Sequence, residues 1–188
     1  TKLLAATNSG TTTISAASVT AAEGKALTFT SNDTITTLTV SGTSSIADAV
    51  TINALDTGSN IGTLAFTAVT GSVADIITSK TVAKLATTIT CTGTATVAQA
   101  ETLRACDATN DGTADTFVYS ISDTYDNLML RTASTGNVDN DAAITQASTV
   151  TVTDNLTVKQ ALAVKKIDTS GTFVYNIVDN DANIVAAL

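Results

Sequence analysis

The chain has 188 residues, of which 44% are hydrophobic but only 4% aromatic, and its net charge is −8 at pH 7. An acidic chain is a poor partner for nucleic acid or anionic membranes, and no apolar run approaches the ~20 residues of a membrane span, so we expect no membrane insertion. The sequence contains no His, Trp or Pro and is rich in Thr, Ala, Val, Asp and Asn. This composition is typical of secreted bacterial proteins, so we expect an extracellular or cell-surface location.

Residues 1–36 contain weakened copies of segments that recur further along the chain. We interpret them as a shortened or partial unit, as found next to the end or a junction of a repeat array. The sequence starts without Met, and its last residues, Ile184–Leu188, stop inside an apolar helical pattern. We therefore expect it to be a piece of a longer array.

Three similar segments begin at Thr37, Thr88 and Thr149, at spacings of 88 − 37 = 51 and 149 − 88 = 61 residues. Each opens with alternating apolar residues and Thr, which predicts a strand with one buried face. The predicted inward pairs are Leu38 with Val40, Ile89 with Cys91, and Val150 with Val152. We divide the chain into repeat 1 (37–87), repeat 2 with an inserted loop (88–148) and a truncated repeat 3 (149–188).

A short helix is predicted after each of these strands. Ser45, Thr96 and Thr157 are suited to N-capping. The apolar residues that follow recur at three-residue steps along one helix face. They are Ile46, Ala49, Ile52 and Leu55; Val97, Ala100, Leu103 and Cys106; and Val158, Ala161, Val164 and Ile167.

A second strand and helix complete each repeat. Phe117, Tyr119 and Ile121 alternate along one strand, and Phe173, Tyr175 and Ile177 along another. Asp123 and Asp179 then stop the alternation, and we predict that they N-cap helices that bury Leu128 and Ile184, at an offset of 184 − 128 = 56. Gly71 takes the place of this Asp in repeat 1, before Ile76. Asn127 and Asn183 are predicted to hydrogen-bond between repeats as a ladder.

The expected fold class is α/β or a β-rich repeat. Strands separated by helices must cross over and are therefore parallel. We expect strand–helix–strand–helix units stacked as a solenoid-like array. The alternative is a set of β-helix or β-sandwich units.

A family resemblance is carried by Asp123-Thr-Tyr-Asp-Asn-Leu128, Asp179-Asn-Asp-Ala-Asn-Ile184 and Ser45-Ile-Ala-Asp-Ala49. These segments resemble the Ala/Thr-rich tandem repeats of large bacterial secreted and surface proteins, in which an Asp-Thr-Ala-Ala-Asn-Ile type segment follows each strand. The resemblance covers roughly residues 37–188 and departs from the pattern at Gly71. It implies a scaffold, adhesin or surface-layer role, and it brings no catalytic residue.

The best metal candidate is the loop Asp107–Asp115. Asp107, Thr109, Asp111 and Asp115 take positions 1, 3, 5 and 9 of a calcium loop, with Gly at position 6. The bidentate Glu of such loops is missing, because position 12 is Val118. Calcium is thus the only cofactor suggested, and a solvated turn is the alternative, because Asp, Asn and Gly also favour turns. Asp139, Asn140 and Asp141, with Asp179, Asn180 and Asp181, are weaker candidates.

Cys91 and Cys106 fill positions that are apolar in the other repeats, so both are predicted to face the core. In a secreted protein they could form a disulfide worth roughly 2–4 kcal/mol. Two small buried thiols are the alternative.

Self-association is the function that this pattern favours: a structural extracellular protein of a surface layer, fibre or adhesin stalk, with other copies as partners. One alternative is an adhesin module that binds calcium, glycan or a cell surface. Another is an ice-binding surface made of the outward Thr residues. An enzyme is not expected, because without His a Ser nucleophile would need Lys as its base, and no such pairing stands out.

Overall fold

The computed structural model describes residues 11–30, 32–56, 60–104, 106, 116–134, 142–167 and 171–187. The chain divides into an N-terminal unit, residues 1–92 with 105–117, and a C-terminal unit, residues 93–104 with 118–188. The boundary therefore runs through strands β5 and β6.

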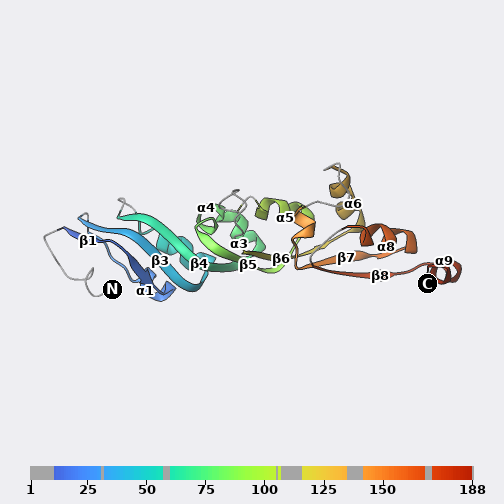
Figure 1. The fold of residues 1–188 in the computed structure, drawn as a ribbon, viewed down its shortest axis with the longest axis horizontal. Coiled ribbons are helices and arrows are strands. Elements are labelled where there is room, and N and C mark those ends of the chain that lie inside the picture. Colours follow the sequence, from blue (N-terminus) through green and yellow to red (C-terminus); the bar gives the residue numbers. More distant parts are fainter. Residues whose placement is uncertain are drawn as a thin grey trace. The chain divides into compact units, whose positions relative to one another are not determined.

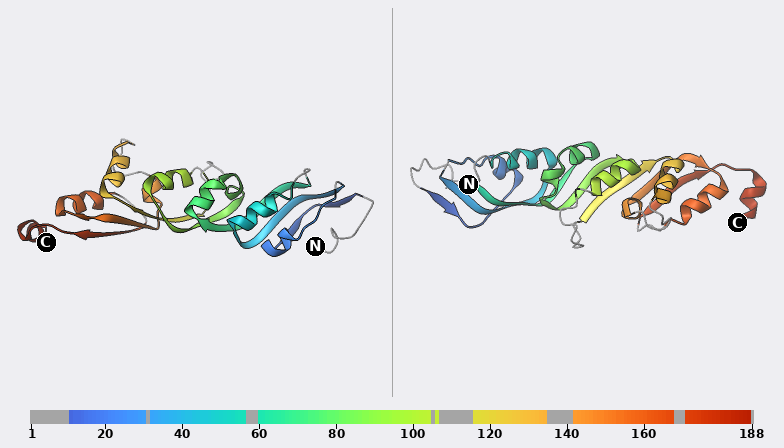
Figure 2. Two further views of the ribbon diagram at one scale, coloured as in Figure 1. Left: turned by 180° about the vertical axis from the view of Figure 1, so that it is seen from behind. Right: turned by 90° about the horizontal axis from the view of Figure 1, so that it is seen from above.

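The strands of the N-terminal unit pair in parallel in the order β1-β3-β4-β5, and β2 also pairs with β3. They are β1 (Thr12–Ile14), β2 (Ala17–Val19), β3 (Asp33–Ser45), β4 (Ile61–Ser72) and β5 (Ala86–Ala95). Short helices connect the strands (Figures 1 and 2). They are α1 (Ala21–Lys25), α2 (Ile46–Asn53), α3 (Val73–Thr78) and α4 (Lys80–Ala83).

The strands of the C-terminal unit are parallel in the order β6-β7-β8. They are β6 (Thr116–Asp123), β7 (Thr149–Leu156) and β8 (Thr172–Ile177). The helices of this unit are α5 (Val97–Arg104), α6 (Tyr125–Ser134), α7 (Ala142–Thr145), α8 (Val158–Lys165) and α9 (Asp181–Ala186). In Figure 1, α5, α6 and α8 lie on the same side of these strands. The predicted α/β class and parallel pairing are confirmed, and no described pair has the antiparallel pairing of a β-sandwich.

The helices begin where a side chain accepts a hydrogen bond from the free N–H groups of the first turn. Ser45 caps α2 through the N–H of Asp48, at 3.0 Å. Thr157 caps α8 and forms a reciprocal capping box with Gln160. Thr96 and Gln99 make the same pair of contacts at the start of α5. The three predicted caps at Ser45, Thr96 and Thr157 are thus confirmed.

The core is a layer of small and branched side chains between the strands and their helices. All six predicted inward residues of the first strands are buried, from Leu38 and Val40 at 0% exposed to Cys91 at 9%. On the helices, Ala49, Ala100 and Ala161 are also buried, because a small side chain lets each helix approach the strands closely. Leu55 and Val158 are only half-buried, unlike the rest of the predicted helix faces.

The prediction is wrong for part of the second strand and helix of repeat 3. Ile177 is 45% exposed and Ile184 37% exposed, whereas both were predicted to be buried. The physical reason is that β8 is the last strand in the sheet order, so no described strand lies beyond it.

A left-handed backbone occurs at Gly42, with φ +75°, and at Gly93, with φ +80°. Both follow a buried inward pair, and the pairing of β3 with β4 shifts register between Val40 and Thr43. A similar shift separates Thr151 from Asn155 on β7. Gly42 lies within the shift on β3, where glycine adopts the left-handed backbone because it has no Cβ.

Among the described helices, none combines the length and the apolar character needed to cross a bilayer.

Candidate functional site

Asp123 joins the end of β6 to the helix that follows the neighbouring strand. Its carboxylate accepts hydrogen bonds from the backbone N–H of Val97 at 2.9 Å, the N–H of Thr124 at 2.8 Å and the side-chain amide of Asn127 at 2.6 Å. Burial by itself would raise the pKa of Asp123, but these three donors outweigh it and hold the pKa below its usual value. The group is therefore ionised at neutral pH and acts as a structural clamp.

Asp179 makes the same contacts at an offset of 179 − 123 = 56 residues. It accepts from the N–H of Val158 at 2.9 Å, the N–H of Asn180 at 2.8 Å and the side-chain amide of Asn183 at 2.8 Å. The hydrogen bond from Asn183, followed by those from Val158 and Asn180, lowers the pKa of Asp179. We call each such Asp, with its three donors, an aspartate clamp.

The predicted capping roles of these aspartates are wrong in one respect. The helices that follow them are capped by the next residue instead, since Thr124 accepts from the N–H of Asn127 and Asn180 from the N–H of Asn183. Each aspartate lies one residue too early to cap the helix that follows it. It accepts a hydrogen bond from the first residue of an earlier helix instead, Val97 of α5 or Val158 of α8.

The predicted ladder of Asn side chains between repeats is also wrong. Asn127 and Asn183 each donate to the aspartate four residues earlier in the same segment. The Asn side-chain amides are therefore engaged within their own segments.

Gly71 stands where the other segments have the clamp aspartate, and the structure explains the departure. A Cβ on Gly71 would lie 2.6 Å from Cγ2 of Ile46, the first residue of α2. The Ile46 side chain therefore fills the space that a carboxylate would need.

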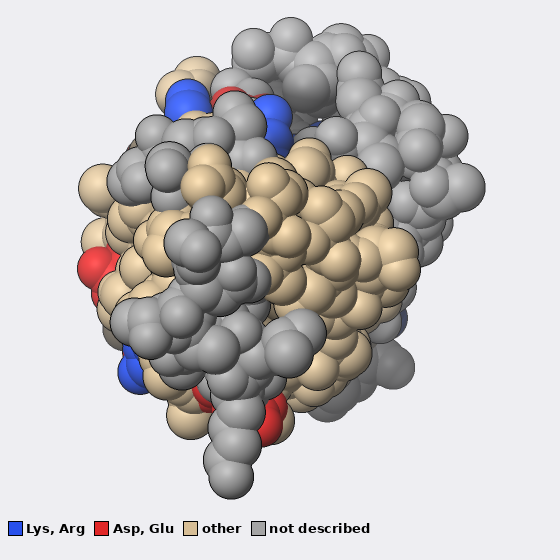
Figure 3. Space-filling model, turned by 90° about the vertical axis from the view of Figure 1, so that its left-hand side faces the viewer, with Lys and Arg blue, Asp and Glu red and all other residues tan. Residues whose placement is uncertain are grey.

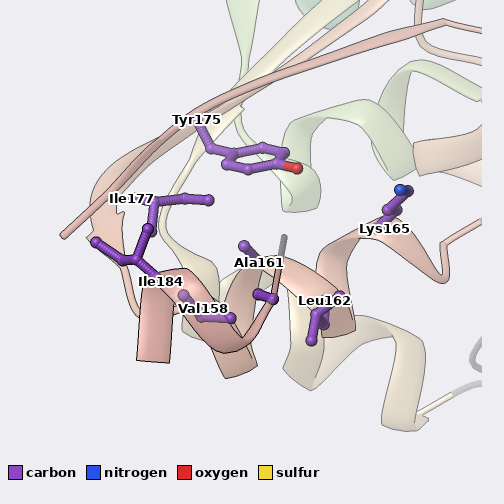
Figure 4. A pocket seen from close by; sticks show the side chains of 8 residues that line it. Val158, Ala161, Leu162, Lys165, Tyr175, Ile177 and Ile184 are labelled. Carbon is purple, nitrogen blue, oxygen red and sulfur yellow. The ribbon is translucent and has the colours of Figure 1, made fainter. Parts of the chain in front are cut away.

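An apolar groove, with a volume of about 350 Å³, lies between β8, α8 and α9. Figure 4 shows Tyr175 and Ile177 pointing from β8 toward Val158 and Ala161 on α8, with Ile184 of α9 at one side. Leu162, Lys165 and Ala187 complete the lining. We call this surface the β8 groove.

The equivalent surface on β6 is covered. Tyr119 is 1% exposed, and Ile121 and Leu128 are fully buried. The Tyr119 hydroxyl donates a hydrogen bond to the carbonyl of Ala143 on α7, at 2.6 Å. The β8 groove is thus formed by the same motif, but no described helix or strand covers it as α7 and β7 cover the motif on β6.

The chemistry of the β8 groove suits an apolar protein surface. Lys165 is the only charged residue among those that line it, and the Tyr175 hydroxyl is the other polar side-chain group. Leu162 and Lys165 were not predicted as site residues, because nothing local in the sequence marks the exposed face of α8. The sequence also predicted Tyr119 and Tyr175 alike, because two near-identical segments carry no local signal of which one is covered.

The calcium candidates Asp107, Thr109, Asp111 and Asp115 lie outside the described residues, as do Asp139, Asn140 and Asp141. Within the described ranges, which include Asp179 and Asp181, no group of three or more acidic, Cys or His side chains could hold a metal ion. Calcium binding stays a prediction.

Cys91 and Cys106 are both buried, as predicted. Burial, with a smaller contribution from the neighbouring Cys106, raises the pKa of Cys91 to about 11. Burial also raises the pKa of Cys106, and Lys84 and Lys80 oppose this effect. The disulfide between them stays a prediction.

The outward Thr residues form short rows across neighbouring strands. In the C-terminal unit, Thr149 on β7 lies beside Ser120 on β6 and Thr172 on β8. In the N-terminal unit, Thr90 on β5 lies beside Thr70 on β4. Most of these side chains are only half-exposed.

No family model, no curated protein and no solved structure matches this chain, so its residues and geometry alone carry the functional argument.

Proposed function

We propose that this chain is a structural protein of the bacterial cell surface. Its strand–helix–strand–helix units stack as a solenoid-like array, and copies associate into a surface layer, fibre or adhesin stalk. The partners are other copies of the chain.

The aspartate clamp is the observation that carries this proposal. Asp123 and Asp179 make the same three hydrogen bonds, 56 residues apart in the chain. Each clamp ties a strand to the helix of its neighbour, so it stabilises the step from one element to the next. A contact that recurs between successive strand–helix elements supports an architecture in which similar units stack one after another.

The position of the glycines supports the same interpretation. Gly42 and Gly93 share a left-handed backbone, and each follows an inward pair on the first strand of a proposed repeat. Apart from the glycine itself and its two chain neighbours, no described atom lies within 4 Å of where the Cβ of either residue would be. A conformational requirement, and not packing, therefore accounts for glycine at both positions.

Electron microscopy and light scattering of the purified chain test the proposal. We expect fibres or sheets at high concentration, with scattering that rises steeply with concentration. Measurements with calcium and with excess chelator separate intrinsic assembly from assembly that requires the metal. Dispersed monomers under all of these conditions would count against the proposal.

An ice-binding surface is a second candidate, favoured by the row of Ser120, Thr149 and Thr172 across three adjacent strands. Adjacent strands place such hydroxyls at a regular spacing of about 4.8 Å. Thermal hysteresis of the unsubstituted chain tests it, with Thr149→Leu as the variant. Freezing at the equilibrium melting point, with no hysteresis gap, excludes this candidate.

A further inference from the structure

We propose that the β8 groove binds a second copy of this chain through the β1–β2 edge of that copy, so that copies join head to tail with parallel strands. This inference rests on the proposed self-association. It adds which two surfaces of the chain meet and the relative direction of their strands.

The C-terminal unit itself contains a model for this contact. On β6, the same Phe-Val-Tyr-x-Ile pattern is covered by a parallel strand, with Val150 of β7 opposite Ile121 and Val152 opposite Asp123. The helix α7 precedes β7 and receives the Tyr119 hydrogen bond. On β6, the motif is therefore covered by an apolar strand that runs parallel to it, and we expect the same of a strand that covers β8.

Side chains on and beside β8 and on α8 remain exposed. Leu162 is 53% exposed, Ile177 45% and Val178 61%. Burying large aliphatic side chains on association stabilises the complex, because apolar surface is removed from water. An added strand would cover Ile177 and Val178 as β7 covers the equivalent part of β6.

The β1–β2 edge of a second copy has the form that this site requires. Both strands pair with β3 in parallel, so their outer edge has the polarity that a strand next to β8 needs. β2 leads into α1 through a capping box of Thr20 and Glu23, as β7 leads into α8 through Thr157 and Gln160. The edge is therefore a strand–helix element of the same kind as the one beside β6.

The absence of charge along both edges also favours this partner. Neither residues 12–19 nor residues 172–178 contain a charged side chain, and the whole chain has no Pro. Exposed edge strands of monomeric proteins are usually protected by Lys, Pro or inward-pointing charges. Seen from the side of β1, the described surface is mostly uncharged, with acidic and basic side chains near its margin (Figure 3). Two edges that carry no charge and have matching direction, with no described strand outside either, are suited to each other.

The contact is heterologous, because it joins two different surfaces of the same chain. Each added copy presents a fresh β8 groove, so association does not end at a dimer unless the rotation closes a ring.

Two variants, each blocking one surface, test the proposal. Ile177→Asp puts a charge in the β8 groove, and Ala17→Asp puts one on the half-buried face of the β1–β2 edge. We expect each variant alone to be monomeric by sedimentation, with association weakened by at least about tenfold, because an unpaired charge would be buried. An equimolar mixture should form a one-to-one heterodimer through the two intact surfaces.

Leu130→Asp is the matched control, because Leu130 is 73% exposed on α6 and does not line the β8 groove. This variant should assemble like the unsubstituted chain. Hydrogen exchange of the unsubstituted assembly gives a second measurement that needs no substitution. Amides of β8 and of β1–β2 should both gain protection on assembly.

The outcomes separate this inference from the proposed function. If Ala17→Asp still dimerises alone, the contact joins two β8 edges, and the inference is overturned while self-association stands. The same holds if both variants assemble normally, or if only β8 gains protection. If the unsubstituted chain stays monomeric at high concentration, both proposals fail and the groove has a different occupant.

Discussion

The backbone N–H of Val97 donates a hydrogen bond to the carboxylate of Asp123, 26 residues later in the chain, at 2.9 Å. Val97 is the first residue of α5, and Asp123 is the last residue of β6. One carboxylate therefore satisfies a free helix N–H, the N–H of Thr124 and the amide of Asn127. This aspartate therefore ties the end of β6 to the start of α5.

Asp123→Ala should lower the free energy of unfolding by about 1–2 kcal/mol, because it leaves a buried N–H and a side-chain amide without their acceptor. Asp126→Ala removes the same charge from an exposed position three residues later and should change much less. Urea unfolding of both variants measures the difference. Equal losses would mean that net charge, and not the clamp, sets the stability.

Stability should fall in acid as the clamp is protonated. The folded pKa of Asp123 lies below the value of about 3.9 found in unfolded chains. Folding therefore favours the ionised form, and this contribution is complete above about pH 4 and is lost as the pH falls through the folded pKa. Asp33 acts in the same direction, because hydrogen bonds from the N–H and hydroxyl of Thr30 lower its pKa.

The difference in unfolding free energy between the unsubstituted chain and Asp123→Asn, measured from pH 7 to pH 2, checks this dependence. We expect the difference to shrink as the pH falls below about 4. A difference that stays constant over the whole range would contradict an ionised clamp.

Gly71 and Gly42 should respond differently to asparagine. Gly42→Asn should be tolerated with a small loss, because Asn accepts the left-handed backbone and nothing lies within 4 Å of the new Cβ. Gly71→Asn should destabilise the chain by about 1–3 kcal/mol, since the new Cβ meets Ile46 at 2.6 Å. Thermal melts of the two variants decide the order, and the reverse order would refute the packing explanation.

Tyr119→Phe should cost about 1–2 kcal/mol, because the Ala143 carbonyl loses a buried donor at 2.6 Å. Tyr175→Phe is the matched variant, as Tyr175 lines the open β8 groove. At concentrations where the chain is monomeric, Tyr175→Phe should leave the melting temperature nearly unchanged. A comparable loss at both tyrosines would show that the two environments do not differ as described.

The Cys91 thiol should resist alkylation in the folded protein at pH 8, because its pKa is raised to about 11 by burial and by Cys106. Only the thiolate reacts, and its fraction at that pH is about one in a thousand. Labelling under reducing conditions, with and without urea, measures the protection. Rapid labelling without urea would mean that this part of β5 opens readily.

The alternation of apolar residues and Thr was enough to predict the strands. Val40 and Val152 are buried on the inward face as expected. Successive side chains of a strand point to opposite faces, so alternating apolar residues must share one face. The caps at Ser45 and Thr157 were also predictable, since they depend on residues three positions apart. The role of Asp123 was not predictable, because its acceptor contact to Val97 spans 26 residues.

The sequence by itself determined the elements: parallel strands with one buried face and short capped helices between them. The buried face follows from the period of two, the parallel direction from the helix that connects consecutive strands, and the caps from residues three positions apart. Only the tertiary structure decided that Tyr119 is buried and donates to Ala143 while Tyr175 lines an open groove. The physical reason is that burial depends on which element packs over a side chain, and two nearly identical segments can have different neighbours.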